Sequence, residues 1–139
     1  MLDTRRYLVL GGAVGLFSLL TGCRLLRPAG SSVVEAMESA PGVTGAEINF
    51  GPGGGLRSHI SGTITLGVTS EALHDAFDEA WRRGVEALHR RYDGERGILV
   101  DAIFGEGADG AEVTSTDLVE LGRSRHATLG HFYDHYGAN

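Results

Sequence analysis

Three histidines near the C-terminal end offer imidazole nitrogens for chemistry: His126, His131 and His135. His131 and His135 are separated by four positions, so a helix would place both side chains on one face. Imidazole is a common ligand of zinc and copper, and the neighbouring Asp134 adds a carboxylate. The metalloprotease pattern His-Glu-x-x-His is absent. Two interpretations therefore stay open, namely a metal site formed by the three histidines or the solvent-exposed face of a terminal helix.

A second set of polar side chains lies on a glycine-rich loop that contains Glu106, Asp109 and Glu112. Carboxylate oxygens are the ligands that Ca²⁺ prefers. The spacing differs from that of an EF-hand, which alternates its ligands and closes on a glutamate. A solvated acidic loop between two elements is the favoured interpretation.

The usual signatures of cofactor binding and nucleophilic catalysis are missing. The loop Gly51-Pro52-Gly53-Gly54-Gly55 lacks the Lys-Ser/Thr of a phosphate-binding loop and joins two expected strands, so it predicts a hairpin turn. The chain has one cysteine, which excludes an intramolecular disulfide framework and a Cys₄ zinc site. We therefore predict no cofactor and no enzymatic activity. A small envelope hydrolase that uses a carboxylate pair stays open as a third function class.

The N-terminal residues have the organisation of an export signal. Arg5 and Arg6 precede an uncharged run from Tyr7 to Leu20, and small residues follow it. The run is too short for a membrane span, which needs about 20 apolar residues. Leu20-Thr21-Gly22-Cys23 resembles the lipobox of bacterial lipoproteins at all four positions. The resemblance implies cleavage after Gly22 and diacylglyceryl modification of the Cys23 thiol.

The export route has two candidates. Thr4-Arg5-Arg6-Tyr7-Leu8 is similar to the twin-arginine motif, although Leu8 stands where phenylalanine is usual. An ordinary Sec signal with two arginines is the alternative. Both routes give the same organisation: 1–22 as signal peptide, 23–31 as lipid anchor and short tether, and 32–139 as one domain.

The charge of the chain restricts its partners. The formal net charge is −6, which argues against nucleic-acid binding. Removing Asp3, Arg5 and Arg6 with the signal removes a net +1, so the mature chain carries −6 − 1 = −7. An anionic bilayer repels such a domain, and the lipid on Cys23 must supply the membrane affinity. The tether reaches at most about 28 Å, which keeps the domain near the membrane surface.

The elements of the domain follow from hydrophobic periodicity. A short helix is expected from Ser32 to about Ala40, and alternation predicts a hairpin whose apolar residues include Ile48 and Ile64. A long helix opens at Thr69-Ser70 and ends at Gly94. Further elements follow: a central strand at 98–104, an ambiguous segment at 111–121, and a final helix at 127–136.

This order predicts an α+β fold, a two-layer sandwich with a mainly antiparallel sheet and helices on one face. The arrangement loosely resembles part of a ferredoxin-like fold, which by itself implies no function. Trp81, on the apolar stripe of the long helix, is expected at the core centre, facing residues among Ile60, Ile64, Val100 or Phe104.

The resulting expectation is a lipoprotein on the extracytoplasmic side of the cell membrane. Its domain acts as a non-enzymatic binding or accessory module at the envelope, and an envelope protein is the expected partner. The runner-up is a metal-binding lipoprotein that uses the C-terminal histidines.

Overall fold

The computed structural model describes residues 31–52, 58–123 and 126–138. The predicted lipobox and signal peptide lie outside these residues. The elements, in chain order, are α3 (Ser31–Glu38), β1 (Val43–Pro52), β2 (Ser58–Leu66), α4 (Ser70–Arg91), β3 (Leu99–Glu106), β4 (Glu112–Thr114), a 3₁₀ helix (Ser115–Leu118), β5 (Ala127–Thr128) and α5 (Leu129–Tyr136).

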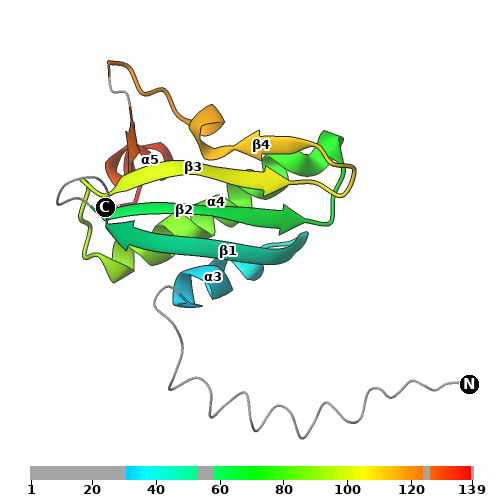
Figure 1. Ribbon diagram of the computed structural model, residues 1–139, viewed down its shortest axis with the longest axis horizontal. Helices are drawn as coiled ribbons and strands as arrows, with labels where there is room; N and C mark the ends of the chain where they lie inside the picture. The colour runs from blue at the N-terminus through cyan, green and yellow to red at the C-terminus, as the bar shows by residue number, and fades with distance from the viewer. Residues whose placement is uncertain (1–30, 53–57, 124–125, 139) are drawn as a thin grey trace, which may run out of the picture.

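The strands form one sheet in the order β1-β2-β3-β4, and β5 also pairs with β3 (Figure 1). β1 with β2, β3 with β4 and β3 with β5 are antiparallel. β2 and β3 are parallel, because α4 carries the chain back to the same end of the sheet. The predicted α+β two-layer fold with a mainly antiparallel sheet is confirmed. No helix within the described ranges has the length and apolar character needed to cross a membrane.

The core lies between α4 and the sheet. The predicted apolar stripe of α4 is buried, from Leu73 and Phe77 to Leu88. Trp81 is fully buried, and its ring packs edge to face with the ring of Phe132 of α5 at a centroid distance of 5.4 Å. α3 packs on the same helix, and a Cβ at Gly84 would lie only 2.8 Å from the Met37 side chain. The predicted burial of Trp81 in the core is therefore confirmed.

The central strand β3 departs from simple alternation. Ile60 pairs with Val100, and Gly62 pairs with Ile103, so β3 contains one extra residue between the two pairs. This bulge lets Val100 and Ile103 both face α4, although they differ in parity. The bulge thus explains why apolar residues occur at both even and odd positions of 98–104.

Phe104 corrects one detail of the predicted core. The expectation included it among the strand residues that Trp81 faces. Its neighbour Gly105 faces Phe77 of α4, since an added Cβ there would lie 2.4 Å from the Phe77 ring. Because side chains alternate along a strand, Phe104 points to the opposite face, where it is 37% exposed.

Residues 31–139 expressed without the preceding segment are expected to unfold in one cooperative transition. The buried residues of α3, α4, α5 and the sheet form one continuous hydrophobic cluster, and a domain of about 100 residues can fold on such a core without a disulfide. Thermal unfolding followed by near-ultraviolet and far-ultraviolet circular dichroism checks this. Two non-coincident transitions would contradict it.

Candidate binding surfaces

The predicted histidines do not all come together. His131 and His135 of α5 line an open hollow of about 430 Å³ beside the segment that follows the 3₁₀ helix, with Asp134 and Glu120. The apolar part of this hollow is lined by Leu118 and Val119. His126 is exposed and is not among the lining residues. The hollow therefore combines two of the three histidines with two carboxylates.

His131 has a structural role that accounts for its position. Its Nδ1 accepts a hydrogen bond from the backbone N–H of Thr128 at 3.0 Å and lies 3.1 Å from the Thr128 hydroxyl. Thr128 is the N-cap of α5, and this reciprocal contact is a capping box with histidine in the usual place of glutamate. The lone pair of Nδ1 is therefore already engaged at the start of the helix.

Among the described residues, the carboxylates beside these histidines do not form a metal site with them either. Asp134 Oδ2 accepts a hydrogen bond from Arg96 Nη2 at 2.8 Å. Within 31–52, 58–123 and 126–138, no group of three or more His, Cys, Asp or Glu side chains is placed to hold a metal ion. The geometry of the described residues thus gives no support to the metal site expected from His126, His131 and His135.

The acidic loop also has a structural role. Asp109 Oδ2 accepts a hydrogen bond from the backbone N–H of Ser70 at 3.0 Å, and its Oδ1 accepts one from Ala111 N–H at 3.2 Å. Ser70 is the first residue of α4, whose N-cap Thr69 makes no side-chain cap. These backbone hydrogen bonds, above all that from Ser70, lower the pKa of Asp109. Asp109 therefore caps α4 from a distant loop, which favours the structural interpretation of this acid.

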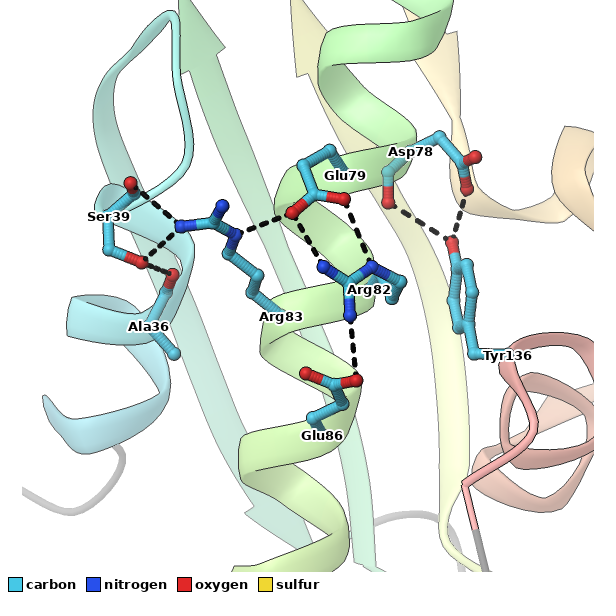
Figure 2. Close-up of polar contacts among 8 residues, drawn as sticks. All are labelled: Ala36, Ser39, Asp78, Glu79, Arg82, Arg83, Glu86 and Tyr136. Atoms are coloured by element: carbon cyan, nitrogen blue, oxygen red, sulfur yellow. Dashed lines mark hydrogen bonds and ion pairs between the residues drawn. The ribbon is translucent and has the colours of Figure 1, made fainter.

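Arginines of α4 join the helical layer through an ion-pair network (Figure 2). Glu79 Oε2 accepts hydrogen bonds from Arg82 Nη2 and Arg83 Nε, both at 2.6 Å. Arg82 Nη1 also pairs with Glu86 at 2.7 Å. Arg83 Nη1 donates to the carbonyl of Ser39, the residue after α3, at 2.9 Å. The network thus connects the end of α3 to α4, and the carboxylates of Glu79 and Glu86 neutralise the positive charge of both arginines.

A second polar contact in Figure 2 fastens α5 to α4. Tyr136 OH donates a hydrogen bond to Asp78 Oδ1 at 2.7 Å. Burial, followed by this hydrogen bond, raises the pKa of Tyr136 above its ordinary value. The phenol therefore stays protonated and keeps the contact over the usual pH range.

The Glu79 network predicts a loss of stability in acid. Hydrogen bonds from Arg82 and Arg83 lower the pKa of Glu79 from 4.5 to about 2. The stabilisation is present above pH 4.5 and is lost as the pH falls toward 2. Glu79→Gln should therefore cost about 1 kcal/mol at pH 7, a modest value because the carboxylate is partly exposed and screened by solvent. Near pH 2 the free energies of unfolding of wild type and Glu79→Gln should become equal.

Urea unfolding between pH 2 and 7 measures this difference. Glu120→Gln is the matched control, because Glu120 is exposed and forms no ion pair with a described residue. If the difference in free energy of unfolding between wild type and Glu79→Gln stays constant from pH 7 to 2, the stabilising role of the Glu79 carboxylate is contradicted.

The face of the sheet opposite the helices is polar and no described residue covers it (Figure 1). On it, His59 Nδ1 of β2 lies 2.8 Å from Asp101 Oδ2 of β3, with side chains 35% and 55% exposed. Sequence reasoning missed this pair, because the two residues are distant in the chain and periodicity does not reveal that β2 pairs with β3. The contact orients the His59 ring on an exposed surface.

Comparison with protein-family models, with curated proteins and with solved structures finds no match for this chain.

Proposed function

We propose that the chain is a bacterial lipoprotein, held by acyl chains on Cys23 at the extracytoplasmic side of the cell membrane. The observation that carries the proposal is the sequence Leu20-Thr21-Gly22-Cys23 directly after a basic start and an uncharged apolar run. Two acyl chains anchor a protein stably, whereas one gives only reversible binding. The acidic mature chain needs such an anchor, because an anionic bilayer repels it.

We propose further that the anchored domain is a non-enzymatic binding or accessory module. Three of the groups whose types suggested chemistry have structural partners: His131 caps α5, Asp109 caps α4, and Asp134 pairs with Arg96. The open face of the sheet has no described element packed on it, so it is suited to contact another molecule. A protein of the cell envelope is the partner class that this location favours.

Affinity capture from detergent-solubilised membranes tests the binding role. Wild-type protein and Cys23→Ala should be captured in parallel, with a membrane-anchored fusion of unrelated sequence as the background control. If the domain is a binding module at the envelope, the wild-type chain should recover a defined protein at a molar ratio near one to one. Cys23→Ala should recover less of that protein. No enrichment over the background would contradict the role. Turnover of an envelope substrate by the purified chain would favour the hydrolase.

A further inference from the structure

In the described strands, the open face of the sheet carries carboxylates and no arginine or lysine. None of the strands β1 to β5 contains an arginine, and the chain has no lysine. The exposed glutamates on this face are Glu47 of β1, Glu106 of β3 and Glu112 of β4. Each makes no ion pair with a described residue, while four arginines belong to α4 on the other side. α4 also has five acidic residues, so the helical side carries charges of both signs, whereas the described strands carry acidic residues and no arginine.

Two of these glutamates oppose each other. Glu106 and Glu112 are direct cross-strand partners in the antiparallel pair of β3 and β4. Like charges in this position destabilise a sheet, and directly opposite side chains lie about 5 Å apart at Cβ. No described cation relieves the repulsion. A positive group placed between the two carboxylates from outside would relieve it.

An exposed aromatic ring lies among these charges. Phe104, at 37%, is the most exposed large hydrophobic residue in the described part of the chain. Its cross-strand neighbours are Thr63 and Thr114, and Glu47 lies beyond Thr63 in the same row. Strand spacing puts Glu47 about 10 Å and Glu106 about 7 Å from Phe104 along the sheet. An apolar contact is therefore bordered by carboxylates on two sides.

We infer that this face, which we call the Phe104 face (Glu47, Thr63, Phe104, Glu106, Glu112 and Thr114), docks a basic segment of a partner protein. The segment presents arginine or lysine side chains to the glutamates and an apolar side chain to Phe104. Protein interfaces commonly centre on an aromatic anchor within a polar rim, and complementary charge gives them specificity. The inference rests on the proposed binding role and specifies its surface and the chemistry of its partner.

A fluorescein-labelled peptide in which arginine and leucine alternate serves as the probe. The full chain, purified in non-ionic detergent, is titrated into it and the fluorescence anisotropy is measured at physiological salt. The face variant combines Glu47→Gln, Glu106→Gln and Glu112→Gln. The matched control combines Asp75→Asn, Asp93→Asn and Glu120→Gln, which removes the same charge from exposed positions outside the Phe104 face.

The face variant is expected to weaken binding about tenfold, and the control less than about twofold. Phe104→Thr should also weaken binding about tenfold. The dependence of the dissociation constant on salt concentration should stay unchanged, because this variant removes an apolar contact and no charge. Equal weakening by the two triple variants would overturn the inference, since binding would then follow net charge alone.

Sedimentation of the same preparations distinguishes a second copy of the chain. A dimer that Phe104→Thr converts to monomer would assign the face to self-association and overturn the partner assignment. Fatty-acid labelling of the same preparations reports separately on the anchor. Labelled protein that fails to bind the peptide contradicts the Phe104 face and leaves the lipoprotein proposal standing.

Discussion

Trp81→Ala is expected to lower the free energy of unfolding by about 3–5 kcal/mol, a large share of the 5–15 kcal/mol that a domain usually has. The Trp81 side chain is fully buried, and its ring contacts Phe132 edge to face. Alanine would leave a cavity between α4 and α5 that backbone shifts can fill only in part. Urea unfolding followed by circular dichroism measures the loss without relying on the tryptophan signal.

Phe104→Ala is the matched control for this experiment. It also removes an aromatic ring, but from the exposed face of β3. We expect it to cost about 1 kcal/mol or less, because only cross-strand contacts are lost. A loss below about 1 kcal/mol for Trp81→Ala, or equal losses for the two variants, would contradict the placement of Trp81 at the core centre.

Cys23→Ala should abolish incorporation of labelled fatty acid and leave unprocessed precursor. The proposed lipid attachment uses the Cys23 sulfur, and this is the only cysteine of the chain. Labelling in a bacterial host, followed by electrophoresis, gives the result. Leu25→Ala is a suitable control, because it changes a neighbouring residue outside the lipobox. If Cys23→Ala still incorporates label or is still cut after Gly22, the lipoprotein proposal is wrong.

Most elements of the fold could be predicted because their apolar residues follow the helix or strand period. The expected final helix at 127–136 was wrong at its start, where Ala127–Thr128 forms β5. The stripe of α4 from Leu73 to Leu88 matches the observed burial, and the observed bounds Ser70–Arg91 agree with the expected start and end. In the ambiguous segment 111–121, the structure has β4 followed by the 3₁₀ helix. The sequence does not decide between strand and helix in this segment, because the three residues of β4 are too few to show a period.

Other features depend on contacts between distant residues. The bulge between Val100 and Ile103 requires the pairing of β3 with β2, and it turned Phe104 away from Trp81. Asp109 and Ser70 are far apart in the chain, so no local signal indicated that this acid caps α4. The helical spacing of His131 and His135 was informative about the helix, but it could not show that Thr128 engages His131.

Mass spectrometry of the protein purified from bacterial membranes tests the central claim most directly. The account predicts a mature chain that begins at Cys23 and carries a diacylglyceryl group on its sulfur. Treatment with protease should yield one lipid-modified N-terminal peptide, and no peptide from residues 1–22 should remain. A membrane-derived chain that retains the first 22 residues, or that begins at another residue with a free Cys23 thiol, would contradict the account.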